Sequence, residues 1–369
     1  MRPGPEPPEA RGEVSAGVLA ALTGRAGGWP GTETVARAEP LGEDLQLALY
    51  VLYELHYRGF AGVADEREWD PAALGLRVAA EERFLAALRA GVADARNATE
   101  GDATTAEGTA AGGAAGGDRV APALAALLVE PVADEAVEAT SVSHFLAARG
   151  ELWQLREYAA VRSVYHLKEA DPHAWVLPRL TGRAKAAMVA IEFDEFGAGR
   201  AERAHSRLFA ELMADLDLDA GYGRQLDAAP GPALAVVNLM SLFGLRRALR
   251  GALVGHFATV EITSSPGSRR LAEALRRVGA GPAAERFYEE HVEADAVHEQ
   301  LVRREVVAGL LDDEPELAAD VVFGIEATAL VEDALARHLL TAWRAGRSAL
   351  RRPASGADRQ GLTARAVVA

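Results

Sequence analysis

The segment His291-Val-Glu-Ala-Asp-Ala-Val-His298 is the most informative stretch of the chain. It places a histidine, a carboxylate and a second histidine at i, i+4 and i+7, which lie close to one stripe of an α-helix. Good helix formers surround it, and no proline or glycine occurs between Pro282 and Gly309. Imidazole and carboxylate groups suit iron or manganese. The pattern predicts a helix that presents His291, Asp295 and His298 to a metal; the alternative is a solvated helix face with two chance histidines.

The composition of the whole chain favours an all-α protein. Hydrophobic residues make up 49% of its 369 residues, and strand-like runs of Val, Ile and Thr are few. The net charge of −15 argues against nucleic-acid binding, which needs a basic surface. The absence of cysteine excludes disulfides and cysteine-ligated iron–sulfur clusters, so histidine and carboxylate are the natural metal ligands.

The chain also lacks an apolar run long enough to span a membrane, and its first residues lack the apolar region of a signal peptide. These features predict a cytoplasmic protein that is not bound to a membrane. Walker loops, dinucleotide fingerprints and Gly-x-Ser-x-Gly elbows do not occur in the sequence.

Breaker residues and low-complexity composition predict five parts. Residues 1–40 are expected to be a polar, partly disordered lead-in, and residues 41–100 a helical N-terminal extension. Residues 101–120, rich in Gly, Ala and Thr, are expected to form a flexible linker. Residues 121–350 form the predicted main helical domain, and residues 351–369 a flexible tail.

Helical periodicity in the main domain predicts about seven helices and no strand. They are expected near residues 143–167, 178–195, 200–216, 232–263, 269–278, 283–311 and 315–347. The run Ser264-Ser-Pro-Gly267 is expected to close the apolar 232–263 segment, which is one long helix or a pair.

A metal site on one helix is incomplete, because helical carboxylate–histidine sites draw ligands from several helices. Glu261 is a candidate, since it lies in an otherwise apolar stretch where an ionised carboxylate is costly unless paired or coordinated. The alternative is an exposed helix-end carboxylate just before Thr263, and the sequence favours neither. His256, five residues before Glu261, is expected to be a packing or surface histidine.

A second place with candidate ligands runs from Glu195 to His205. Ten residues span roughly 15 Å on a straight helix, too far for two ligands of one cluster. Gly197 and Gly199 can break the helix and fold the chain back. Neighbouring acids are rivals for the role of Glu195, namely Glu192 and Asp194. Without the downstream histidine motif, solvated acids around a glycine turn would be the favoured interpretation.

The order Glu195-x9-His205, Glu261, His291-x3-Asp295-x2-His298 resembles the haem-oxygenase-like diiron oxidases and oxygenases, in particular the bacterial iron-containing redox enzymes. The phrases Glu-Phe-Gly-Ala-Gly-Arg-Ala-Glu-Arg-Ala-His-Ser-Arg-Leu and His-Val-Glu-Ala-Asp-Ala-Val-His-Glu are similar to those of that group. The resemblance covers residues 143–347, and the segment 45–60 resembles an N-terminal extension of some members.

This resemblance implies a haem-oxygenase-like seven-helix bundle, two iron ions, O2 as co-substrate and a homodimer. It carries the ligand roles onto six residues, namely Glu195, His205, Glu261, His291, Asp295 and His298. Glu261 is the expected bridging carboxylate. Some relatives add a carboxylate from the preceding helix, for which Glu169 is suitably placed, although a helix-end acid is the alternative.

The expected activity is O2-dependent oxidation of a small organic substrate, such as an amine, an amino acid or a fatty-acid-like molecule. N-oxygenation and oxidative C–C cleavage are both implied by the resemblance, and an external electron donor is a further expected partner. One alternative is a non-enzymatic iron-binding helical protein. Another is a haem-degrading oxygenase, which would leave Asp295 and His298 without a role.

Overall fold

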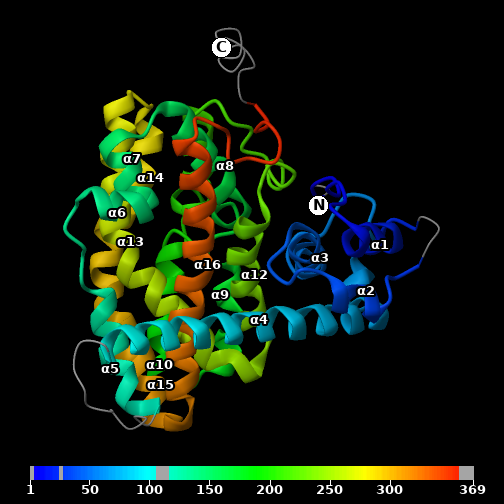
Figure 1. The fold of residues 1–369 in the computed structure, drawn as a ribbon, viewed down its shortest axis with the longest axis horizontal. Coiled ribbons are helices and arrows are strands. Elements are labelled where there is room, and N and C mark those ends of the chain that lie inside the picture. Colours follow the sequence, from blue (N-terminus) through cyan, green and yellow to red (C-terminus); the bar gives the residue numbers. More distant parts are fainter. Residues whose placement is uncertain (1–3, 25–27, 105–115, 357–369) are drawn as a thin grey trace.

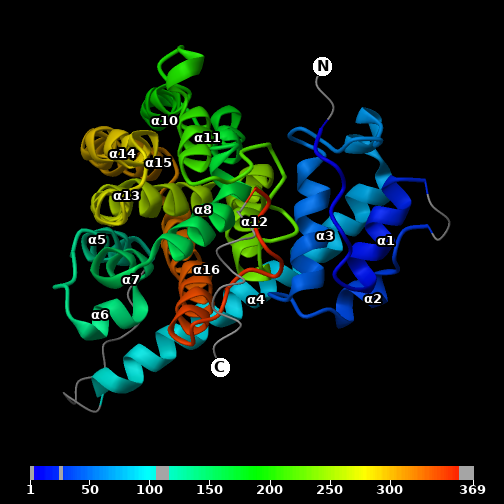
Figure 2. The same cartoon turned by 90° about the horizontal axis from the view of Figure 1, so that it is seen from above.

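The computed structural model describes residues 4–24, 28–104 and 116–356, without the side chains of residues 99–104, 116–118, 295 and 296. Helices make up the fold, and no strand occurs in these ranges, which confirms the all-α prediction. Figure 1 shows a small N-terminal lobe, which we define as residues 4–70, beside a larger bundle of residues 142–344. The long helix α4 runs from the lobe across one side of the bundle, where it packs against α16 (Figures 1 and 2).

The lobe and its connection to the bundle are helical. Their elements are α1 (Glu13–Leu22), α2 (Thr32–Arg37), α3 (Glu43–Glu54), η1 (Asp65–Trp69), α4 (Pro71–Thr104), α5 (Gly116–Leu127) and α6 (Glu135–Thr140). Helices α1 and α2 bury Val14, Val18 and Val35. The expected lead-in of residues 1–40 is therefore corrected, because short apolar stripes dock these two helices in the core.

The bundle contains the remaining elements in chain order. They are α7 (Val142–Arg149), α8 (Leu152–His166), α9 (Asp171–Ala174), η2 (Leu177–Arg179), α10 (Gly182–Glu195), η3 (Ala201–Arg203), α11 (His205–Asp215), α12 (Gly231–Leu245), η4 (Arg247–Leu249), α13 (Arg250–Val278), α14 (Pro282–Leu301), the π-helix η5 (Val302–Val307), α15 (Ala308–Asp313), η6 (Pro315–Leu317) and α16 (Ala318–Arg344). Helix α13 packs along both α14 and α16, and α11 packs on α14.

Helix α12 lies at the contact between the lobe and the bundle. Its sequence is apolar on every side, and a helix of that kind must be covered on every side. Helix α3 covers one face, and α16, α13 and α8 cover others. Within the described ranges, no single helix is both long and apolar enough to cross a membrane. Helix α12 and the following segment Arg247–Val278 are long and apolar enough only when taken together, and the two are bent by 107° relative to each other.

Two segments that the sequence pattern predicts to be non-helical are helical in part or in full. Helix α13 continues through Ser264-Ser-Pro-Gly267 to Val278, because Leu271, Ala272 and Leu275 of its later turns are buried. The expected 101–120 linker is helical up to Thr104 and again from Gly116. Residues 105–115 lie outside the described ranges, so the linker between them stays a prediction.

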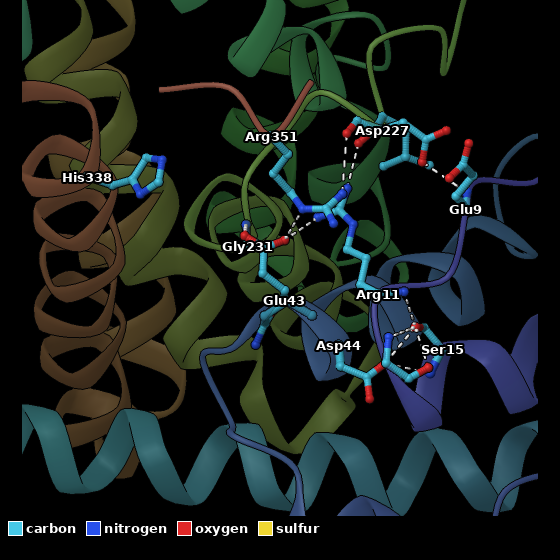
Figure 3. Close-up of polar contacts among 12 residues, drawn as sticks. Glu9, Arg11, Ser15, Glu43, Asp44, Asp227, Gly231, His338 and Arg351 are labelled. Atoms are coloured by element: carbon cyan, nitrogen blue, oxygen red, sulfur yellow. Dashed lines mark hydrogen bonds and ion pairs between the residues drawn. The ribbon is translucent and has the colours of Figure 1, made fainter. Parts of the chain in front are cut away.

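A polar network fixes the lobe to the bundle (Figure 3). The Glu43 carboxylate of α3 accepts hydrogen bonds from Arg11 (2.7 Å) and from the backbone N–H of Gly231 (2.6 Å), and Arg351 lies 3.1 Å from it. Glu43 thereby links the first residues of the lobe, the start of α12 and the segment after α16.

Candidate metal centre

Side chains that could bind a metal converge from five segments in the core of the bundle. They are Glu169 in the turn after α8, Glu195 at the end of α10, His205 at the start of α11, Glu261 in the middle of α13, and His291 and His298 on α14. All six are buried. They form two groups of three, in each of which one ligand atom per residue lies within 4.8 Å of the others.

The first cluster consists of Glu169, His205 and His291. The Nδ1 atom of His291 lies 2.8 Å from the Phe287 carbonyl oxygen, to which it donates, so Nε2 is left to face Glu169 at 3.7 Å. The rings of His205 and His291 lie 4.3 Å apart. Glu169 Oε2 is buried and has no hydrogen-bond partner among the described groups. Buried acceptor atoms of this kind are what a metal ion would satisfy.

The second cluster consists of Glu195, Glu261 and His298. His298 Nδ1 lies 3.1 Å from Glu261 Oε2 and 3.7 Å from Glu195 Oε1. Glu195 also connects the two clusters, because its Oε2 lies 2.8 Å from Nδ1 of His205 in the first cluster. The two carboxylate oxygens of Glu195 thus face different clusters.

The buried carboxyl groups in and beside the two clusters differ in the direction of their pKa shifts. Burial alone would raise the pKa of the Glu169 carboxyl, but His166 and His291 outweigh it and hold that pKa well below its ordinary value. Burial raises the pKa of Glu192 well above its ordinary value, and the carboxylates of Glu195 and Glu261 add to the effect. Glu169 is therefore suited to bind a cation as an anion, whereas the shift of Glu192 favours its uncharged form.

The loop between Glu195 and His205 is built on glycine. Helix α10 ends at Glu195, and Gly197 and Gly199 both have φ of +79°, which returns the chain so that α11 begins at His205. A Cβ atom on Gly197 would lie 2.3 Å from the Arg200 carbonyl oxygen. The close approach of the two ligands therefore depends on this turn.

The structure resolves several alternatives that the sequence left open. Glu261 is 5% exposed in mid-helix, so the exposed helix-end alternative is wrong. Of the rival acids, Asp194 is half-exposed and lies 3.3 Å from His298 Nε2, and Glu192 is buried but outside both clusters. The side chain of Asp295 is outside the described part of the chain, and its ligand role stays a prediction.

A cavity of about 470 Å³ opens beside both clusters. Its lining includes four candidate ligand residues, namely Glu169, Glu195, Glu261 and His291. It also includes Arg162, whose guanidinium binds the Glu332 carboxylate through two hydrogen bonds of 2.8 and 2.7 Å. The cavity thus brings a charged pair and the buried carboxylate–histidine groups to one space.

Sequence reasoning missed His166, which supports the first cluster from outside. Its Nδ1 atom donates a 2.8 Å hydrogen bond to Glu169 Oε1 and so orients that carboxylate. The spacing of three residues between His166 and Glu169 at a helix end was the available signal.

Two further histidines, His173 and His256, contact each other, and His173 lines the cavity. The Thr328 hydroxyl donates its hydrogen to the Gly324 carbonyl oxygen, so it must accept a hydrogen bond from Nδ1 of His256. Because the proton of His256 is then on Nδ1, its Nε2 accepts a hydrogen bond from Nε2 of His173 at 3.1 Å. The expectation of a packing role for His256 is confirmed. Burial lowers the pKa of His173 to about 4, and burial beside His173 lowers the pKa of His256 further below its usual range.

Acid should therefore destabilise the metal-free protein through His173. The pKa of His173 is about 4 in the folded chain and about 6.5 in the unfolded chain, so folding is favoured while the imidazole is neutral in both states. This contribution to stability is complete above pH 6.5 and is lost as the pH falls towards 4. Between pH 7 and pH 5 the loss should be roughly 2 kcal/mol in the free energy of unfolding. Urea unfolding at both pH values should show a smaller loss in His173→Gln; parallel losses in the two proteins would contradict the assignment.

A helical bundle with two adjacent, buried carboxylate–histidine groups has the side chains to hold metal ions between facing helices. This donor set, without sulfur, fits iron. Residues 156–333 match the family described as "Iron-containing redox enzyme". The match includes all seven predicted ligand positions.

A nitrosourea synthase of Streptomyces achromogenes subsp. streptozoticus is 24% identical over 161 residues, which is 43% of this chain and 34% of the relative. The chain thus matches about a third of the length of this curated relative. Together the family and the relative support an iron-containing oxidoreductase.

Proposed function

We propose that the chain is a non-haem diiron oxidase or oxygenase that uses O2 to oxidise a small organic substrate. The observation that carries the proposal is the pair of three-residue clusters joined through Glu195 and open to one cavity. A purely iron-storing protein would not need a cavity that ends on the ligands. The cavity therefore favours an enzyme over the non-enzymatic alternative.

In this proposal one iron is held by Glu169, His205 and His291, and the other by Glu195, Glu261 and His298. Asp295 completes the set, as the family resemblance implies. When bound, ferrous iron supplies the electrons and the Lewis acidity for O2 reduction. Glu195 holds both clusters at a fixed separation, because its two oxygens face different clusters.

Residues around the clusters orient the ligands and shape the pocket. Phe287 and His166 hold the His291 ring and the Glu169 carboxylate through hydrogen bonds. Tyr165 lines the cavity, and burial beside Glu169 and Glu195 raises the pKa of its phenol well above the ordinary value. Tyr165 therefore remains a neutral hydrogen-bond donor at neutral pH, on the substrate side of the centre.

The substrate in this proposal is an amine or amino acid, and N-oxygenation is the first reaction to test. The support is the relative named for nitrosourea synthesis, since a nitroso group contains oxidised nitrogen. Charged groups that line the cavity, Arg162, Glu332 and Asp333, suit a polar substrate better than an acyl chain. A homodimer and an external electron donor are further parts of the proposal.

Anaerobic titration with Fe(II) tests the proposal directly. The protein should bind about two irons per chain, and iron should raise its melting temperature, because the cations relieve repulsion among buried carboxylates. A pulse of O2 should then be consumed and the iron oxidised. Binding of one iron, or a haem Soret band in the purified protein, would contradict the diiron assignment.

A further inference from the structure

Glu169 differs from the other clustered ligands, because it lies outside a helix. Residues 167–170 form a turn between α8 and α9, and Ala170 has φ of +73°. A positive φ is unfavourable for alanine. Such a turn persists only where its surroundings hold it in place.

The surroundings that hold this turn come from the N-terminal lobe. Lys168, the residue before the ligand, extends its ammonium group away from the cluster to Glu54 of α3, at 2.8 Å. The two side chains are 1% and 0% exposed. Arg58 of the lobe donates a further hydrogen bond of 3.1 Å to the Leu167 carbonyl oxygen of the same turn.

Both partners of the ion pair are themselves fixed in position. The Glu54 carboxylate also accepts a 2.6 Å hydrogen bond from the Tyr222 hydroxyl. The ammonium of Lys168 lies over the rings of Tyr50 (4.6 Å) and Tyr57 (4.2 Å). A buried ion pair contributes little net stability compared with apolar residues of the same size, but it defines geometry. This pair lies one residue from a proposed iron ligand.

We infer that the N-terminal lobe positions the iron ligand Glu169 through the buried Lys168–Glu54 ion pair. The inference rests on the proposed diiron function. Lys168 and Glu169 are adjacent in one turn but bind different partners, so the lobe fixes the backbone while His166 orients the carboxylate. Lys168 and Glu54 are thus positioning residues for the first cluster, and the second cluster has no such link through this turn.

The test compares Fe(II) affinities of the full-length chain under anaerobic conditions, measured by competition with a chelator. Lys168→Met removes the ammonium but leaves Glu54 buried without its cation, which endangers folding. The double variant Lys168→Met with Glu54→Gln removes both charges and keeps a partner for Tyr222. Glu43→Gln is the matched control, because it weakens another link between lobe and bundle without touching the turn (Figure 3).

The double variant should fold with a melting temperature near that of the wild type. It should bind one of its two irons about 10- to 100-fold more weakly, as losses of supporting contacts around ligands do. Glu43→Gln should bind both irons as the wild type does. The inference is overturned if the double variant keeps both affinities, or if Glu43→Gln weakens the same iron equally. A wild-type chain that fails to bind two irons would overturn the proposed function instead.

Discussion

Replacing Glu169 with alanine should produce a folded chain that binds about one ferrous ion in place of two. The first cluster would keep only His205 and His291, whereas Glu195, Glu261 and His298 would remain intact. Two imidazoles without a carboxylate are a poor site for iron compared with three ligands in a buried pocket. Iron counted after anaerobic loading and gel filtration measures the effect, and circular dichroism checks the fold.

Two further variants make this result specific. Glu261→Ala should remove iron from the second cluster and leave the first, so the double variant with Glu169→Ala should bind almost none. Glu192→Gln is the control, because Glu192 is buried nearby but lies outside both clusters, and its raised pKa favours the uncharged form that glutamine resembles. It should bind two irons. Full occupancy in Glu169→Ala, or loss of iron in Glu192→Gln, would show that the ligands are grouped differently.

Gly197→Ala should have the largest effect of any single substitution in the glycine loop. Its φ of +79° disfavours alanine, and the new Cβ would lie 2.3 Å from the Arg200 carbonyl oxygen and 2.5 Å from the Ala204 nitrogen. Backbone atoms cannot relieve such a clash by rotation about a side-chain bond. We expect a loss of roughly 2–5 kcal/mol in the free energy of unfolding. Iron should be lost from both clusters, because Glu195 and His205 serve different ones.

Gly199→Ala is the matched control for that prediction. Gly199 has the same φ of +79°, but the nearest atom to its added Cβ would be a ring carbon of Phe193 at 3.8 Å. This variant should lose only about 1–2 kcal/mol and keep both irons. Urea unfolding and iron content measured side by side would separate steric conflict from backbone preference. Equal losses in the two variants would contradict the packing described for Gly197.

The sequence predicted the helical class and the α14 helix because both depend on local information. The stripe that contains His291 and His298 has helical spacing, and the flanking residues favour a helix. Glu195 and His205 were predictable only through the two glycines between them. Their spacing on a straight helix would have excluded a shared centre, and the turn at Gly197 removes that objection.

Other features depend on tertiary contacts that no local pattern reveals. Ser264-Ser-Pro-Gly267 has the composition of a helix end, yet α13 continues because its later turns are buried. The place of Glu169 in the first cluster, and not at a solvated helix end, depends on α11 and α14 packing against its turn. The partners of Lys168 lie far away in the sequence, at residues 50–57, so the local sequence does not indicate that this lysine is buried.

The ion pair between Lys168 and Glu54 has a consequence for how the sequences of related proteins diverge. The segment that matches the iron-containing redox enzymes begins at residue 156, so it contains Lys168 but not Glu54. A lineage that lost the lobe would retain a buried ammonium without its counter-charge, and selection should replace it. Lysine at this position and glutamate on α3 should therefore be inherited together among relatives. Homologues without the lobe should have an apolar or solvent-exposed residue beside the equivalent of Glu169.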